Sequence, residues 1–127
     1  MTFCSLVLIM LAATLQSSTQ KDEVMTKENG TFVVNTTTLG KSVLGYASPT
    51  PVKIYIKKNK VEKVEFLKNQ ETPKYFARIK KLLLTKWEGM KVSKAQKTDV
   101  DGVTGATLSS DAVKENVKRG LNYYKKH

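Results

Sequence analysis

At 127 residues the chain has room for one domain and a short targeting segment. Its 22 Lys and Arg against 11 Asp and Glu give a formal net charge of +11, which indicates an anionic partner such as nucleic acid, a membrane face or an acidic protein. The single histidine, His127, is the last residue, which excludes a His-based metal cage, haem ligation and a Ser/His/Asp triad.

The first 20 residues have the pattern of a signal peptide. Phe3 to Leu15 is uncharged and is followed by the small polar run 16–19. This apolar run is shorter than the roughly 20 residues that a spanning helix needs, although an uncleaved anchor stays an alternative.

Cleavage would remove Cys4 and leave a mature domain, 21–127, without a thiol. Disulfides, iron–sulfur clusters and thiolate metal sites are then excluded, so any redox chemistry needs an organic cofactor. Export also argues against nucleic acid as the partner.

The first half of the mature chain predicts strands. We expect a mobile lead-in over 21–30, a first strand over 31–34 and, after a turn at Gly40, a second over 42–47. The clearest strand is 52–57, whose alternation places every second residue on one face, namely Val52, Ile54 and Ile56.

The chain then turns at 58–60 and returns as a strand over 61–67. Val64 and Phe66 point inwards in this strand, and Val61 is out of phase with them, which predicts a bulge or a late strand start.

Two helices are predicted in the second half. Thr72 is a natural N-cap and Pro73 suits the first helical position of a helix that Gly89 closes. Its inward-facing residues are Phe76, Ile79, Leu83 and Trp87. A second helix follows Ser110, with apolar positions Val113, Val117, Leu121 and Tyr124. We therefore predict a single α+β domain, in which a largely antiparallel sheet packs against two helices.

The stretch from Asp101 to Ser110 is a small, hydroxyl-rich loop that leads into the last helix. Unpaired N–H groups and the positive end of the helix dipole suit a phosphate at such a point. Gly105 and Ala106 let another molecule approach the backbone closely. The hydroxyls nearest to the helix, of which one can carry a phosphoester, belong to Thr107, Ser109 and Ser110.

The pattern Asp-x-x-Thr-Gly-Ala-Thr-x-Ser-Ser of this stretch resembles the flavinylation motif of the FMN-binding domain family. That family includes flavinylated subunits of the sodium-translocating NADH:quinone reductase and of the related Rnf complex. The resemblance implies that a separate flavin transferase, using FAD, esterifies the phosphate of FMN to Thr107. It extends from Gly40 to Leu121 and includes Glu71-Thr72-Pro73, where Lys74 replaces the family's usual glycine.

Other residues have both ordinary and cofactor-binding interpretations. Asp101 makes an Asx turn or is recognised by the transferase, and Thr104 shapes the turn or touches the phosphate. Ser109 and Ser110 either cap the helix or donate hydrogen bonds to the phosphate. Glu71 and Thr72 suit the first turn and the N-cap, or contact the flavin. Of Tyr46, Tyr75 and Trp87, Tyr46 is the preferred partner for the flavin ring and Trp87 suits the core. The predicted FMN-binding set is Thr107, Thr104, Gly105, Ala106, Ser109, Ser110, Asp101, Glu71, Thr72 and Tyr46.

These features predict an exported electron carrier, not an enzyme with its own substrate pocket, that relays electrons between a membrane reductase and an extracytoplasmic acceptor. Its partners would be the flavin transferase and a membrane-bound redox protein. One alternative is a small basic secreted module that binds anionic lipid, polysaccharide or an acidic protein; another is an enzyme or sensor that binds FMN reversibly. The lysine pairs 57–58, 80–81 and 125–126 suit solvated faces, and their field can steer an acidic partner.

Overall fold

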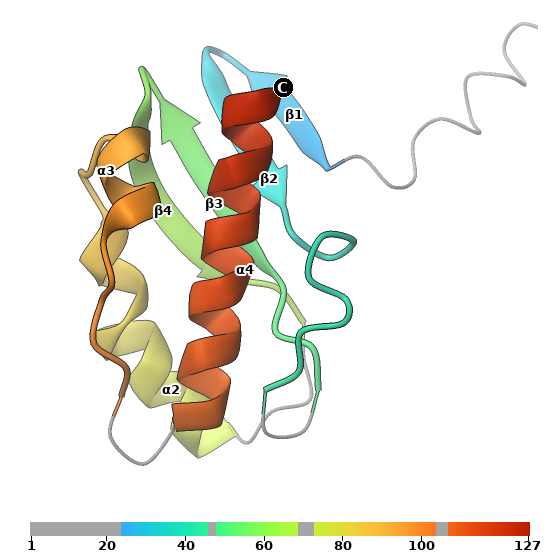
Figure 1. Cartoon of the computed structure of the whole chain (residues 1–127), viewed down its shortest axis with the longest axis vertical. Helices are drawn as coiled ribbons and strands as arrows, with labels where there is room; N and C mark the ends of the chain where they lie inside the picture. Colours follow the sequence, from blue (N-terminus) through green and yellow to red (C-terminus); the bar gives the residue numbers. More distant parts are fainter. Residues whose placement is uncertain (1–23, 46–47, 69–72, 104–106) are drawn as a thin grey trace, which may run out of the picture.

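The protein is an antiparallel sheet with helices packed against it, as a computed structural model shows for residues 24–45, 48–68, 73–103 and 107–127 (Figure 1). The strands, in the spatial order β1-β2-β3-β4, are β1 Met25–Glu28, β2 Thr31–Asn35, β3 Val52–Lys57 and β4 Lys60–Phe66. They are followed by α2 Pro73–Leu82, the 3₁₀ helix η1 Leu84–Trp87, α3 Val92–Lys97 and α4 Thr107–Lys126. The predicted α+β class and the antiparallel sheet are confirmed.

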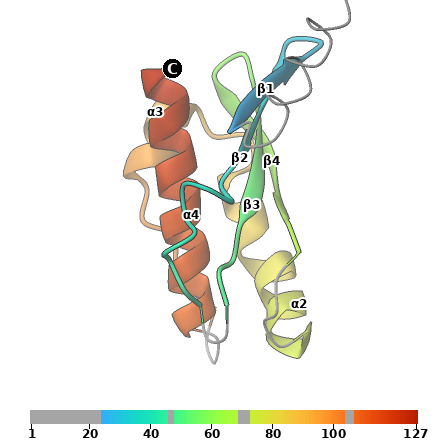
Figure 2. The ribbon, with the colours of Figure 1, turned by 90° about the vertical axis from the view of Figure 1, so that its right-hand side faces the viewer.

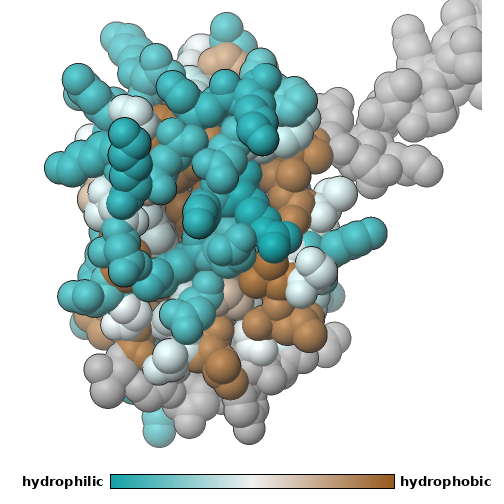
Figure 3. Space-filling model, in the orientation of Figure 1, coloured by the Kyte–Doolittle hydropathy of each residue, from teal (hydrophilic) through white to brown (hydrophobic). Residues whose placement is uncertain are grey.

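The long helix α4 lies along one face of the sheet, with α3 beside it, and α2 continues beyond the end of β4 (Figures 1 and 2). Much of the surface on the α4 side is hydrophilic, with hydrophobic areas towards its lower part (Figure 3). Within the described part of the chain, no helix is both long and apolar enough to cross a membrane.

Two tight hairpins connect the outer strands of the sheet. In the β1–β2 turn Asn29 and Gly30 have φ values of 51° and 83°, and in the β3–β4 turn Lys58 and Asn59 have 52° and 63°. Positive φ at both central residues is the geometry of a type I′ turn, which matches the twist of the paired strands. The lead-in predicted over 21–30 is therefore wrong for 25–28, because these residues pair with β2.

The strand predicted over 42–47 is also wrong for its described part, 42–45. Leu44 makes only an isolated bridge with Pro49, and its side chain is 64% exposed. The Gly45 N–H donates to the Ser48 carbonyl at 2.9 Å, so the chain turns back on itself here. Prolines at 49 and 51 lack N–H groups, which limits ladder pairing along this segment. Residues 46 and 47 lie outside the described residues.

The strand pair β3–β4 follows the sequence prediction closely. Val52, Ile54 and Ile56 are fully buried on one face, as their alternation indicates. The register shifts between Tyr55, opposite Lys63, and Ile56, opposite Val61, which confirms the bulge. The alternative of a late strand start is wrong, because β4 already begins at Lys60.

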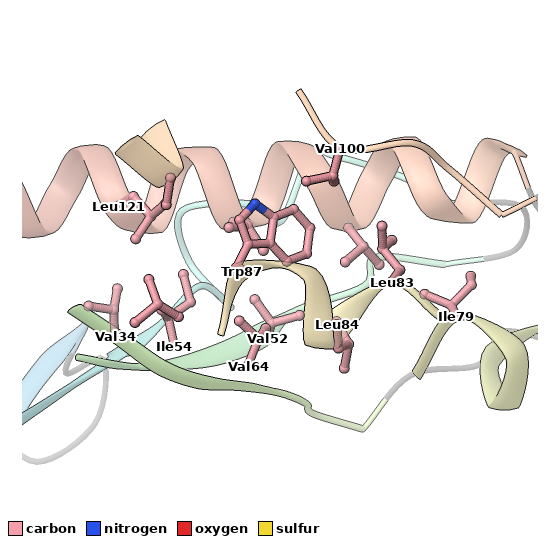
Figure 4. Close-up of a cluster of buried hydrophobic side chains, with 14 of the residues drawn as sticks. Val34, Val52, Ile54, Val64, Ile79, Leu83, Leu84, Trp87, Val100 and Leu121 are labelled. Carbon is pink, nitrogen blue, oxygen red and sulfur yellow. The ribbon is translucent and has the colours of Figure 1, made fainter. Parts of the chain in front are cut away.

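The first predicted helix begins at Pro73 as expected but ends at Leu82 and not at Gly89. The chain continues as the 3₁₀ helix η1, in which residues three apart lie on the same side. This tighter winding buries both Leu84 and Trp87. In Figure 4 Trp87 lies between α4 and the sheet, near Val100 of the segment before α4, and it belongs to the same buried cluster as Val52 and Leu83.

Helix α4 is fixed to the sheet by a buried polar network around Asn116. Asn116 Oδ1 accepts a hydrogen bond from the Thr36 hydroxyl at 2.8 Å, and its Nδ2 donates to Thr50 Oγ1 at 3.3 Å and to the Ala112 carbonyl at 2.9 Å. Thr36 Oγ1 in turn accepts from the Val52 N–H at 2.9 Å. All three polar side chains are fully buried, so the network joins α4 to the end of β2 and the start of β3.

Two glycines let these parts approach closely. A Cβ on Gly120 would lie 2.6 Å from Ile54 Cδ1 and 3.0 Å from Thr36 Cγ2, and a Cβ on Gly40 would overlap the Asn116 side-chain oxygen. Glycine at 120 costs about 1 kcal/mol of helix propensity relative to alanine, which the close packing of helix on sheet offsets.

On the other face of the sheet, the Tyr55 hydroxyl donates to Glu65 Oε1 at 2.7 Å, and Lys63 Nζ lies 3.2 Å from Glu65 Oε2. The hydrogen bond from Tyr55, and then the neighbouring Lys63, lower the pKa of Glu65. The same hydrogen bond, followed by partial burial and the Glu65 charge, raises the pKa of Tyr55.

We predict that Asn116→Ala lowers the free energy of unfolding by about 2–4 kcal/mol, because it leaves a small cavity and buried hydroxyls without their partner. The measurement is the urea midpoint at unchanged slope. Asn122→Ala is the matched control on the same helix, since Asn122 is half-exposed and bonds only Gln96 among the described residues. Equal losses in the two variants would contradict the proposed role of the network.

We also predict that Tyr55→Phe raises the pKa of Glu65 towards its ordinary value. A lowered carboxyl pKa contributes stability above the pKa of the unfolded chain, and this is lost as the pH falls through the folded pKa. Carboxyl ¹³C NMR of Glu65 against pH measures the change, and Lys63→Gln should have the smaller effect. An unshifted Glu65 in Tyr55→Phe would show that the hydrogen bond is not the main cause.

Candidate functional site

The hydroxyl-rich stretch meets the start of α4 earlier than predicted. The helix begins at Thr107, whereas the sequence placed Thr107, Ser109 and Ser110 in the loop before it. The helix start was placed too late because the buried residues of the first turn, Ser109 and Ser110, are small and polar. A search for apolar residues at helical spacing does not detect such a turn. The three hydroxyl side chains therefore belong to the first turn of a 20-residue helix.

These three hydroxyl residues differ in exposure. Thr107 is exposed, as is its neighbour Leu108 at 61%, whereas Ser109 and Ser110 are 3% and 0% exposed. Ser110 Oγ accepts a hydrogen bond from the Val103 N–H at 3.1 Å in a buried position. A Cβ on Gly102 would lie 3.3 Å from Ser110 Cβ, so the loop backbone runs close to the helix. The predicted phosphate-contacting role of Ser109 and Ser110 stays a prediction.

The approach to this helix end is held by both apolar and polar contacts. Val100 and Val103 are buried in the core, and Figure 4 shows Val100 above Trp87. Asp101 is exposed, and its carbonyl oxygen accepts a hydrogen bond from Lys86 Nζ at 3.2 Å. Sequence analysis did not single out Lys86, because its link to the loop arises only when η1 packs beside the segment before α4.

The start of α4 suits an anion. The first turn of this helix contains no acidic residue that would repel one. The dipole of a helix this long adds a positive potential at the same end. Thr107 thus combines an accessible hydroxyl with a field that favours a phosphate.

The remaining candidates lie outside the described residues. These are Tyr46, Glu71, Thr72, Thr104, Gly105 and Ala106, together with the Tyr75 side chain, and their roles stay predictions. Trp87 is 2% exposed, in agreement with its interpretation as a core residue.

The elements that flank those candidates come together at one end of the molecule. The start of α2 and the start of α4 both lie at the lower end of Figure 1. The Leu67 N–H also donates to the Pro51 carbonyl at 3.0 Å, which brings the segment before β3 to the end of β4.

A polar cleft of about 400 Å³ runs beside α4 between the helix and residues 95–100. The Lys114–Asp99 ion pair, with Nζ and Oδ1 3.1 Å apart, lies in it. Its lining includes Trp87, Lys97, Asp111 and Lys118. No sequence motif indicated this cleft, because it depends on how α3 and the connector pack beside α4.

The model of the family described as FMN-binding domain matches residues 45–122 of this chain. The match covers β3 to α4 and begins after β1 and β2. Its limits are close to those of the sequence resemblance, Gly40 to Leu121. No curated protein and no solved structure matches the chain.

We predict that Ser110→Ala lowers the free energy of unfolding by about 1–3 kcal/mol, because the buried Val103 N–H loses its acceptor. Hydrogen exchange at the Val103 amide should become faster as the loop loosens. Ser93→Ala, at an exposed position, is the control and should change stability by less than about 0.5 kcal/mol. Unchanged exchange at Val103 would show that the hydrogen bond does not hold the loop.

Proposed function

The chain belongs to the FMN-binding domain family and has FMN as its cofactor, and on this premise we propose that it is an electron carrier with FMN covalently attached to Thr107. The observation that carries the proposal is the exposure of Thr107 in the first turn of α4. Thr107 is open to solvent at the start of α4, whereas Ser109 and Ser110 are buried and Ser110 already binds the Val103 N–H. Among these three hydroxyls, Thr107 is the accessible nucleophile.

The residues present fit a phosphate-linked flavin. The dipole of α4 favours the negative charge of a phosphodiester at the start of the helix. In the attachment reaction, Thr107 Oγ1 forms the bond to the FMN phosphorus of FAD, the bond to the adenylate phosphate breaks, and AMP leaves with the hydroxyl proton transferred to solvent. The flavin transferase supplies the catalysis for this step, so Thr107 needs only to be accessible.

FMN, when bound, supplies one- and two-electron redox chemistry that none of the side chains of the mature domain supplies. The chain's contribution is to hold the phosphate at the end of a rigid helix and to keep the attachment point at the surface. A surface position lets a donor and an acceptor protein approach in turn. This arrangement supports the role of a carrier over that of an enzyme.

We place the carrier outside the cytoplasm, with residues 1–20 as its signal peptide. The uncharged run Phe3 to Leu15 supports this location. The proposed partners are a flavin transferase and a membrane-bound redox protein, and the excess of cationic side chains would favour encounter with an acidic partner surface.

Co-expression with a flavin transferase, followed by denaturation and intact mass spectrometry, tests the attachment. We expect the wild type to gain the mass of FMN less one water and to keep its yellow colour after denaturation and filtration. Thr107→Val should lose both, because it removes the hydroxyl and keeps the side-chain shape.

Thr85→Val, at an exposed threonine of η1, is the matched control and should be flavinylated like the wild type. FMN that is released on denaturation would instead support a reversible FMN-binding protein. A covalent flavin retained in Thr107→Val would assign the linkage to another hydroxyl and contradict the proposal.

A further inference from the structure

Five exposed lysines gather at the end of the molecule opposite the start of α4. Three belong to the β3–β4 hairpin, one precedes α3 and one lies in the last turn of α4: Lys57, Lys58, Lys60, Lys91 and Lys125. We call this group the lysine end. It corresponds to the upper end of Figure 1, where the C-terminus also lies.

Backbone and side-chain contacts hold these lysines in one place. Lys60 and Lys91 form an antiparallel bridge, and the Val92 N–H donates to the Asn59 carbonyl at 2.8 Å. The Tyr124 hydroxyl donates to Asn59 Oδ1 at 2.7 Å, which ties the end of α4 to the hairpin turn. The cluster is therefore formed by the fold, from segments far apart in the sequence.

Two hollows open between these side chains. One of about 320 Å³ is lined by Lys58, Asn59, Lys91, Val92, Ser93 and Lys125. The other, of about 530 Å³, is lined by Lys57, Lys58, Lys60, Val61, Glu62 and Gly89. Glu62 is the one carboxylate among these lining residues, and no ion pair joins any of the five lysines to another described residue. The lysine end thus presents uncompensated positive charge, which anionic groups would relieve.

We propose that the lysine end binds the anionic phospholipid headgroups of a membrane surface. The lysine ammonium is a compact charge that can interact with phosphate groups in many orientations. The five residues of the lysine end include no arginine, whose guanidinium suits bidentate binding of one carboxylate or phosphate. Each lysine close to an anionic leaflet contributes about a fivefold factor in partitioning. The upper part of the surface is mainly hydrophilic in Figure 3, so the contact is electrostatic and not an insertion.

The choice of a membrane over an acidic redox protein rests on the proposed function. The helix between Thr107 and the lysine end has 20 residues, which at 1.5 Å a residue is about 30 Å. Electron transfer slows steeply with distance, so a redox partner docked on the lysines would stand far from a flavin on Thr107. A membrane bound there instead leaves the flavin end free to meet its partners.

Co-sedimentation of the full chain with lipid vesicles tests the proposal. The comparison is between phosphatidylcholine alone and phosphatidylcholine mixed with phosphatidylglycerol. We expect binding that requires phosphatidylglycerol and weakens as salt is added. Lys58→Glu/Lys91→Glu/Lys125→Glu should lower the partition coefficient by at least roughly a hundredfold, since three contributions of about fivefold are lost and three repelled charges are added.

The matched control is Lys74→Glu/Lys80→Glu/Lys81→Glu, which makes the same change in net charge on exposed lysines of α2, at the other end of the molecule. It should keep most of the binding. The apolar run Phe3 to Leu15 is common to all variants, so any insertion by that segment cancels in the comparison. An equal loss in both triple variants would show a general charge effect and overturn the proposal.

Retention on a polyglutamate column tests the alternative that the lysine end binds an acidic protein. Retention there without any phosphatidylglycerol-dependent sedimentation would overturn the membrane assignment in favour of a protein partner. Thr107→Val made without flavin should sediment like the wild type. Vesicle binding and flavin attachment can therefore fail separately, and a failure of one identifies which proposal is wrong.

Discussion

The structure depends on the seating of α4 against the sheet, and above all on the buried hydrogen bonds of Asn116. The amide joins Thr36 and Thr50, which are far apart in the chain, and every one of these polar groups is removed from water. Such a network is stable only when each member has its partner. It therefore holds α4 against the sheet and also fixes the position of the helix along it. Glycines at 40 and 120 allow the close approach that these short bonds need.

The position of α4 determines which residues lie at the two ends of the molecule. Its first turn exposes Thr107 beside a backbone that favours anions, and its last turn brings Lys125 to the lysines of the β3–β4 hairpin. The chain is strongly basic as a whole, and at the lysine end five exposed lysines surround two hollows whose lining contains a single carboxylate, Glu62. One end is thus suited to carry a flavin and the other to meet an anionic surface, with the length of the helix between them.

The sequence predicted the elements whose signal is local. Alternation identified β3, the phase of Val61 indicated a bulge or a late strand start, and Thr-Pro identified the start of α2. It missed β1, although Asn29-Gly30 is a strong hairpin signal, because the charged residues around it suggested a polar lead-in. The break after Leu82 and the Asn116 network depend on tertiary packing, which one sequence does not show. At the site, the motif predicts Thr107 as the attachment residue, whereas the burial of Ser109 and Ser110 required the helix start to be known.

We propose that Thr107 carries the flavin through its side-chain oxygen. Tandem mass spectrometry of the tryptic peptide 98–114, from protein made with a flavin transferase, tests it most directly, because this peptide contains every hydroxyl of the motif. We expect fragment ions that place the whole FMN mass on Thr107. A flavin mass on Thr104, Ser109 or Ser110, or a peptide without any flavin, would contradict it.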